Sequence, residues 1–148
     1  MARVAFVICG EREATLDAVQ NAWTIAWRRL GSLRDPSQVK SWLIAIAANE
    51  ARQHVRHARR AVVVDISHAM EQRGGQDPAE SASVVDLARA LGGLSADDRR
   101  LLALRFVAGL DSPEIAQLVG LSSSGVRSRL SRLVDRLRAE LEPVGLEQ

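Results

Sequence analysis

The stretch from Leu94 to Leu141 constrains the fold more than any other part of this 148-residue chain, because its helix signals follow one another at short intervals. Ser95, with Asp98 three residues later, has the form of a capping box and predicts a helix start. Gly109 supplies a residue that tolerates the left-handed conformation at the end of that helix. The stretch is therefore expected to open with one helix that ends near Gly109.

Two further helices are predicted in the same stretch. Asp111 and Glu114 form a second capping box, with Pro113 where a missing N–H costs nothing. Gly120 permits a tight turn, and Ser122 is the predicted N-cap of a third helix. Apolar residues recur along that last helix at steps of three and four, as Val126, Leu130, Leu133, Leu137 and Leu141. This order of elements is typical of a helix-turn-helix.

The face of the last helix opposite this stripe is polar and basic. In a helix-turn-helix the first turns of the last helix enter the major groove, where side chains reach base edges and later arginines meet phosphates. Arg127, Ser128 and Ser131 are the base-edge candidates, against the alternative of a merely solvated face. The full predicted DNA-binding set is Ser123, Ser124, Arg127, Ser128, Arg129, Ser131 and Arg132.

Charge is distributed unevenly, although the net charge is only +2. Residues 1–60 hold ten Arg or Lys against five Asp or Glu, residues 61–93 hold two against five, and residues 94–148 hold eight of each. Clustered positive charge indicates a surface for polyanions. Aromatic residues are few, which favours packed helices over a β-sandwich. The predicted fold class is all-α.

Three helices are also predicted before residue 60. Residues 3–9 have the pattern of the tail end of a helix, and a second helix is expected over about residues 12–30. Asp35 before Pro36 is a start signal for a third helix, which is expected to end at about Arg60.

Apolar stripes in the two longer helices are predicted to be buried. They comprise Leu16, Val19, Ala22, Trp23, Ala26, Trp27 and Leu30 in the second helix, and Val39, Trp42, Leu43, Ile46 and Ala47 in the third. The tryptophans are thus expected in the core, not stacked on unpaired bases. Beyond Ala48 the third helix becomes polar and basic, with Asn49, Arg52, Gln53, Arg56, Arg59 and Arg60.

The periodicity stops over residues 61–77, an acidic stretch that contains two glycines. The next helix start signal is Asp-Pro-Ala-Glu at residues 77–80. The predicted organisation is therefore two small helical domains, residues 1–60 and 78–148, joined by a flexible linker over residues 61–77.

The sequence lacks the motifs that several functional classes require, namely metal binding, membrane insertion and catalysis. Cys9 is the single cysteine, and His54 and His57 share a helix face without a third ligand, so no metal site is expected. No apolar run approaches the roughly 20 residues that span a bilayer, and no signal-peptide cleavage pattern is present. No Gly-rich phosphate loop or nucleophile–base pair is found. We therefore expect that the protein is not an enzyme and binds no cofactor. We also expect it in the reducing cytoplasm.

Two runs of the sequence resemble the extracytoplasmic-function (ECF) sigma factors of the bacterial sigma-70 family. LSADDRRLLALRFVAGLDSPEIAQLVGLSSSGVRSRLSRLVDRLRAEL is similar to region 4 of these proteins. REATLDAVQNAWTIAWRRLGSLRDPSQVKSWLIAIAANEARQHVRHARR is similar to region 2, including the D-x-V-Q run at residues 17–20 and the W-L-x-x-I-A-x-N run at residues 42–49. The resemblance implies a non-enzymatic transcription initiation factor that brings core RNA polymerase to promoters.

The resemblance also implies roles for individual residues. Region 4 would read the minus-35 element and touch the β flap of the polymerase, and an anti-sigma factor is an expected partner. In region 2, Asp17 and Gln20, together with Glu13 one turn before Asp17, would dock on the β′ clamp. The expected minus-10 contacts are Asn49, Arg52, Gln53 and Arg56.

This chain departs from the family pattern at three places. Family members carry a further helix ahead of residue 1, so region 2 is expected to be N-terminally short or the start codon misassigned. Leu16, Ala18 and Asn21 make the polymerase-facing helix less acidic, and Gly125 replaces a residue with a β-branched hydroxyl. Two alternatives stay open: a stand-alone helix-turn-helix regulator, similar to the LuxR type, and an interaction module that binds an anti-sigma factor.

Overall fold

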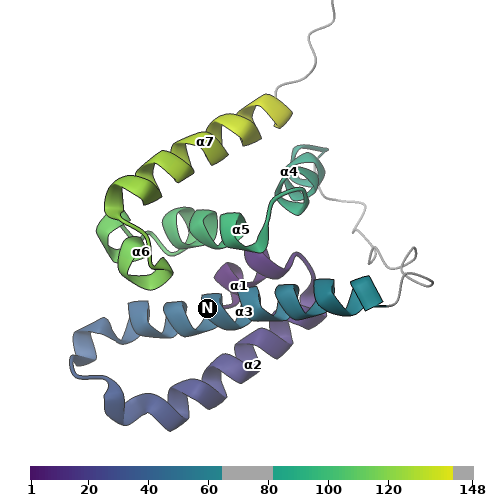
Figure 1. The fold of residues 1–148 in the computed structure, drawn as a ribbon. Helices are drawn as coiled ribbons and strands as arrows, with labels where there is room; N and C mark the ends of the chain where they lie inside the picture. Colours follow the sequence, from purple (N-terminus) through teal and green to yellow (C-terminus); the bar gives the residue numbers. More distant parts are fainter. Residues whose placement is uncertain (65–81, 142–148) are drawn as a thin grey trace, which may run out of the picture.

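The computed structural model describes residues 1–64 and 82–141, and every regular element within these two ranges is helical (Figure 1). The predicted all-α class is thereby confirmed. The start signal at residues 77–80 and most of the predicted linker lie outside the described residues.

The first helical region consists of α1 (Ala2–Cys9), α2 (Arg12–Arg29) and α3 (Val39–Val64), with the 3₁₀ turns η1 (Leu30–Ser32) and η2 (Pro36–Gln38) between the two longer helices. Gly10 ends α1 in the left-handed conformation, and its N–H donates to the carbonyl of Phe6 at 2.8 Å. The side chain of Asp35 accepts a hydrogen bond from the N–H of Ser37 at 2.9 Å, so the predicted start signal acts as expected. α3 extends to Val64, beyond its predicted end.

The buried face of α2 matches the predicted one only in part, because Ala22 and Ala26 of the predicted stripe are buried whereas its large residues are not. A line of small side chains, Ala14, Ala18, Ala22 and Ala26, faces α1 and α3. Trp23 and Trp27 lie on the opposite face and are 55% and 81% exposed, so their predicted place in the core was wrong. Alanines at every fourth position form a smooth ridge that lets another helix approach closely, whereas the large residues of the other stripe would hold it away.

The buried face of α3 is also rotated from the prediction. Its most buried residues are Ile44, Ala47, Ala48, Ala51 and Val55, of which only Ala47 belonged to the predicted stripe. Trp42, Leu43 and Ile46 are half-buried and Val39 is exposed. The core of the first region is therefore made largely of alanine faces on α2 and α3, with Val4, Ala5 and Ile8 of α1.

The second helical region consists of α4 (Ala82–Gly92), α5 (Ala96–Leu102), the π-helical turn η3 (Ala103–Val107), α6 (Ser112–Val119) and α7 (Ser123–Leu141). The predicted capping box between Asp111 and Glu114 is present in both directions, at 2.7 and 2.8 Å. Gly109 and Gly120 both have positive φ, as the predicted turns require. The helix-turn-helix predicted from the sequence is confirmed.

The two helical regions pack directly on each other. α5 lies between α7 and α3, and α1 contacts both α5 and η3 (Figure 1). Ile8 of α1 belongs to the same buried cluster as Leu101 and Leu104 at the centre of the helix-turn-helix. The described residues therefore share one continuous core instead of two separate ones. None of the described helices is long and apolar enough to cross a membrane.

Candidate nucleic-acid interface

The start of α7 is held by Ser122, whose Oγ accepts a hydrogen bond from the N–H of Gly125 at 3.0 Å. This is the predicted N-cap. A Cβ placed on Gly125 would stand 3.1 Å from the same Oγ, which is tighter than most such contacts. The glycine that departs from the family pattern therefore sits directly against the cap of the recognition helix.

The apolar stripe of α7 is buried where it meets the rest of the helix-turn-helix. Val126, Leu130 and Leu133 are buried, Leu137 is half-buried, and Leu141 is exposed at the end of the helix. The predicted DNA-contact residues lie on the remaining surface of the same helix. Exposed among them are Ser124, Arg127, Ser128, Ser131 and Arg132, while Ser123 and Arg129 are half-buried.

Arg129 is engaged within the protein. Its Nε donates to Oδ1 of Asp98 on α5 at 2.8 Å. The same carboxylate accepts a hydrogen bond from Ser95 Oγ at 2.7 Å, and the N–H of Asp98 donates to that Oγ at 3.1 Å. The Ser95–Asp98 motif thus caps α5 as predicted in one direction, but its carboxylate is turned toward α7. Arg129 thereby orients the recognition helix on α5.

The residues predicted to contact the minus-10 element share the middle of α3. Gln53 and Arg56 are exposed and Asn49 is half-buried. Arg52 is only 23% exposed at its side chain, because it forms an ion pair with Asp97 on α5. The face of α3 that carries these residues is therefore partly covered by the second region.

Asp97 sits in a strongly positive environment. Partial burial acts to raise the pKa of Asp97, but the hydrogen bond from Arg52 and the charges of Arg52, Arg56 and Arg129 outweigh it and hold that pKa below its ordinary value. The Asp97 carboxylate is therefore ionised at neutral pH and attracts arginines from both α3 and α7.

Two further arginines, Arg99 and Arg100, were not singled out from the sequence and are buried. Arg100 Nη2 donates to the carbonyl of Leu118 at 2.9 Å and so links α5 to α6. Burial lowers the pKa of both guanidinium groups, and for Arg99 the positive charge of Arg59 lowers it further. These two arginines follow two aspartates in the sequence, so no local pattern marked them as buried.

The residues predicted to bind polymerase are on the outer side of α2. Glu13, Asp17 and Gln20 are all exposed. Beside them runs a strip that we call the apolar strip of α2. It consists of Leu16, Trp23 and Trp27 of α2 with Leu30 at the start of η1, and each of these residues is more than half exposed. Residues 16, 20, 23, 27 and 30 follow one another at helical spacing, so Gln20 lies within the strip and the two carboxylates border it. The alanines at every fourth position, from Ala14 to Ala26, were the signal in the sequence that the other face of α2 is buried.

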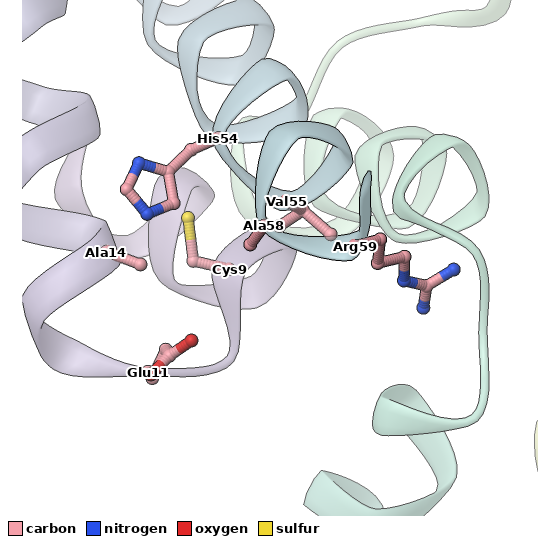
Figure 2. Close-up of a pocket in the computed structure, with 7 residues that line it drawn as sticks. All are labelled: Cys9, Glu11, Ala14, His54, Val55, Ala58 and Arg59. Carbon is pink, nitrogen blue, oxygen red and sulfur yellow. The ribbon is translucent and has the colours of Figure 1, made fainter. Parts of the chain in front are cut away.

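A pocket of about 440 Å³ opens where the end of α1 meets α3. Figure 2 shows its lining residues, with Cys9 and His54 facing the same space. Burial raises the pKa of the Cys9 thiol to about 11, with smaller effects of Arg99 and Glu11. Within the described residues no three His, Cys, Asp or Glu side chains form a metal-binding group. The pocket therefore presents a neutral thiol and no ligand set.

Comparison with protein families finds two matches in this chain. The model described as Sigma-70 region 2 matches residues 1–61, and the model described as Sigma-70, region 4 matches residues 85–137. The two matches coincide with the two helical regions of the structure.

Several proteins are similar over nearly the whole chain. The Probable RNA polymerase sigma factor RfaY of Xanthomonas campestris pv. campestris is 36% identical over 93% of this chain, although the chain spans only 36% of that protein. SigV of Bacillus subtilis is an RNA polymerase sigma factor that is 28% identical, with 94% of this chain and 82% of that protein covered. The ECF RNA polymerase sigma factor SigL of Mycobacterium tuberculosis is 28% identical, with 97% and 84% covered.

A solved structure is similar over both helical regions together. It is the co-crystal structure of the sigma factor RpoE with the anti-sigma factor NepR from Bartonella quintana. The match has a TM-score of 0.79 and 26% sequence identity, and covers 97% of this chain and 91% of the other.

Proposed function

We propose, from the premise that this chain belongs to the ECF group of the sigma-70 family, that it binds core RNA polymerase and directs it to promoters. The observation that carries the proposal is the occurrence of both promoter-reading regions in one chain, in the order of the family, each with arginines at its surface. In this role the protein is a non-enzymatic factor that works in the cytoplasm, where the polymerase and the DNA are.

Reading of the minus-35 element is assigned to α7. Arg127, Ser128 and Ser131 are exposed near the first turns of this helix, which enter the major groove in helix-turn-helix proteins. Ser123, Ser124 and Arg132 flank them and are suited to phosphates. Arg129 contributes by holding the helix in place through Asp98, and contact between Arg129 and DNA requires that pair to loosen.

Opening of the minus-10 element is assigned to the middle of α3. Asn49, Gln53 and Arg56 offer polar groups and a positive charge to an unpaired base and its backbone, which is the combination that single-strand binding needs. Arg52 belongs to this group, but its guanidinium must first leave Asp97.

Docking on the β′ clamp of the polymerase is assigned to the outer side of α2. Glu13 and Asp17 offer negative charge, and Gln20 lies within the apolar strip. A tryptophan as exposed as Trp27 gives a binding partner roughly 150 Å² or more of surface to cover, worth about 4 kcal/mol before the costs of association. The strip thus compensates for the reduced acidity of this helix.

An anti-sigma factor is proposed as a regulatory partner. The support is the similarity of both regions, in one arrangement, to a sigma factor crystallised with its anti-sigma factor. Contact of the second region with the β flap is proposed on the family assignment alone.

Run-off transcription with purified core polymerase tests the proposed function. A library of promoter fragments should yield specific transcripts only when this protein is added. The same protein should be retained on immobilised core polymerase. Retention on DNA without retention on polymerase would instead support a stand-alone helix-turn-helix regulator. A protein that binds neither would support an interaction module.

A further inference from the structure

We infer that α5 carries an internal substitute for DNA phosphates: Asp97 and Asp98 bind the protein's own promoter-reading arginines, Arg52 and Arg129, and promoter DNA must displace the contact to Arg52. This inference rests on the proposed function, because it has the two carboxylates compete with DNA for arginines that the proposed function assigns to promoter binding.

The two carboxylates are neighbours in the first turn of α5 and point to different regions. Asp97 forms an ion pair with Arg52 of α3, and Asp98 pairs with Arg129 of α7. A guanidinium binds a carboxylate and a phosphate through the same donor groups. The charges of Arg56 and Arg129 also act on Asp97, so three of the predicted DNA-contact arginines lie in the field of this pair.

The two carboxylates differ in what else they do. Asp98 belongs to the cap of α5 through Ser95, so its position has a local structural reason. Asp97 has no cap bond, remains 46% exposed at its side chain, and makes its ion pair with a residue 45 positions away in the other region. The contact between Asp97 and Arg52 is therefore an ion pair between the two regions, and it adds to the apolar contacts that hold the second region over the promoter-opening face of α3.

The packing of the two regions also buries a charged side chain, Arg99, and this burial is unfavourable. Arg99 is only 6% exposed, and its Nε has no hydrogen-bond partner among the described residues. Its Nη1 would stand 3.3 Å from a Cβ on Gly10, so it is pressed against the end of α1, and Arg59 adds a like charge nearby. A buried guanidinium without an anion is costly, and separation of the two regions would return it to water. Burial of Arg99 therefore offsets part of the stability that the shared apolar core gives to the packing of the two regions.

The placement of the two regions is similar in a sigma factor crystallised with an anti-sigma factor. The RpoE chain of the NepR co-crystal structure matches 97% of this chain in one superposition, so its two regions are placed similarly. In the present chain an ion pair and apolar contacts between α1, α3 and α5 lie at the junction of the two regions.

DNA binding by the full-length chain, without polymerase, tests the inference. The probe is a fluorescein-labelled, mixed-sequence single-stranded 20-mer followed by fluorescence anisotropy at low salt. Asp97→Asn should bind this DNA about threefold more tightly, because a larger fraction of the molecules is open. Asp86→Asn is the matched control: it removes the same charge from an exposed pair within α4 and should leave the affinity within about 1.5-fold of wild type.

A double-mutant cycle separates opening from a simple change of charge. In an Arg52→Ala background, Asp97→Asn should raise the affinity for the DNA no more than Asp86→Asn does, since the partner of Asp97 is already missing. Small-angle scattering should show a larger radius of gyration for Asp97→Asn than for wild type, with circular dichroism confirming intact helices.

Equal DNA affinities of Asp97→Asn and Asp86→Asn would overturn the inference. A threefold gain in DNA affinity from Asp97→Asn in the Arg52→Ala background would overturn it as well. None of these measurements uses polymerase. A wild-type protein that fails to bind core polymerase would therefore refute the proposed function and leave the internal competition to be judged by itself.

Discussion

Arg129 on the recognition helix and Asp98 on α5 form an ion pair of 2.8 Å, so the carboxylate that accepts a hydrogen bond from the capping residue Ser95 also sets the position of α7. Next to it on the same helix, Arg127 projects freely into solvent. Two arginines that look equivalent in the sequence thus have different tasks in the folded protein.

Replacement of Arg129 and Arg127 by alanine should separate these tasks. Arg129→Ala leaves Asp98, which is mostly buried, without its partner and should lower the free energy of unfolding by about 1 kcal/mol. Arg127→Ala should leave the stability unchanged within about 0.5 kcal/mol. It should instead relax base choice at one position, at a cost of about 1–3 kcal/mol. Urea unfolding and selection from a random duplex library measure the two effects. Equal loss of stability in both variants would contradict the assignment.

Arg136, near the end of α7, should act on all DNA sequences alike. It is exposed and, among the described residues, pairs with Glu140 one turn later, at 2.9 Å. Arg136→Ala should weaken binding to every duplex by a similar factor and reduce the slope of log affinity against log salt by about 1. A salt titration with specific and unrelated duplexes is the measurement. A change of sequence preference in this variant would place Arg136 at base edges instead.

The apolar strip of α2 should contribute to polymerase binding and not to stability. Trp27→Ala removes a side chain that is 81% exposed and should leave the melting temperature nearly unchanged while weakening binding to core polymerase at least tenfold. Trp42→Ala, at a half-buried position of α3, is the matched control and should lower the melting temperature. If Trp27→Ala unfolds the protein while its polymerase affinity persists, the strip is structural.

Charge reversal at Asp17 should affect polymerase binding selectively. Asp17 is exposed on the outer side of α2, away from the alanine face. Asp17→Arg should reduce retention on core polymerase, because it places a positive charge at the proposed clamp contact. Binding of the full chain to duplex DNA should not fall. Loss of both activities would indicate unfolding and not a docking defect.

The stability of the protein should depend on alkaline pH through Cys9. The folded state raises the pKa of this thiol from 9.0 to about 11, chiefly by burial. The unfolded chain therefore loses its proton first, so the contribution is complete below pH 9 and is lost between about pH 9 and 11. A decrease of about 1–2 kcal/mol in the free energy of unfolding is expected over this range. Cys9→Ala should remove that part of the pH dependence, and urea titrations at each pH provide the comparison.

Local signals in the sequence predicted the helix-turn-helix closely. The capping groups at Asp111 and Ser122 and the glycines at 109 and 120 act on backbone atoms within a few residues, so their effect does not depend on distant parts of the chain. The stripe of α7 is buried from Val126 to Leu133 and was assigned correctly there, because the other face of the helix is too polar to be buried.

The orientation of α2 could not be predicted in this way, because two stripes with the same spacing compete on that helix. Large residues at Trp23 and Trp27 carry more apolar surface, yet the alanine line from Ala14 to Ala26 is buried. The outcome depends on how closely α1 and α3 approach, which is a property of the partners and not of α2 itself.

The sequence by itself determined which segments are helical, where the turns of the helix-turn-helix lie and which family the chain resembles, because capping and turn chemistry are local and the motifs are continuous in the chain. Only the tertiary structure decided which arginines are free. Arg52 and Arg129 are paired because α5 brings two carboxylates between α3 and α7, and such pairing depends on segments that are far apart in the sequence.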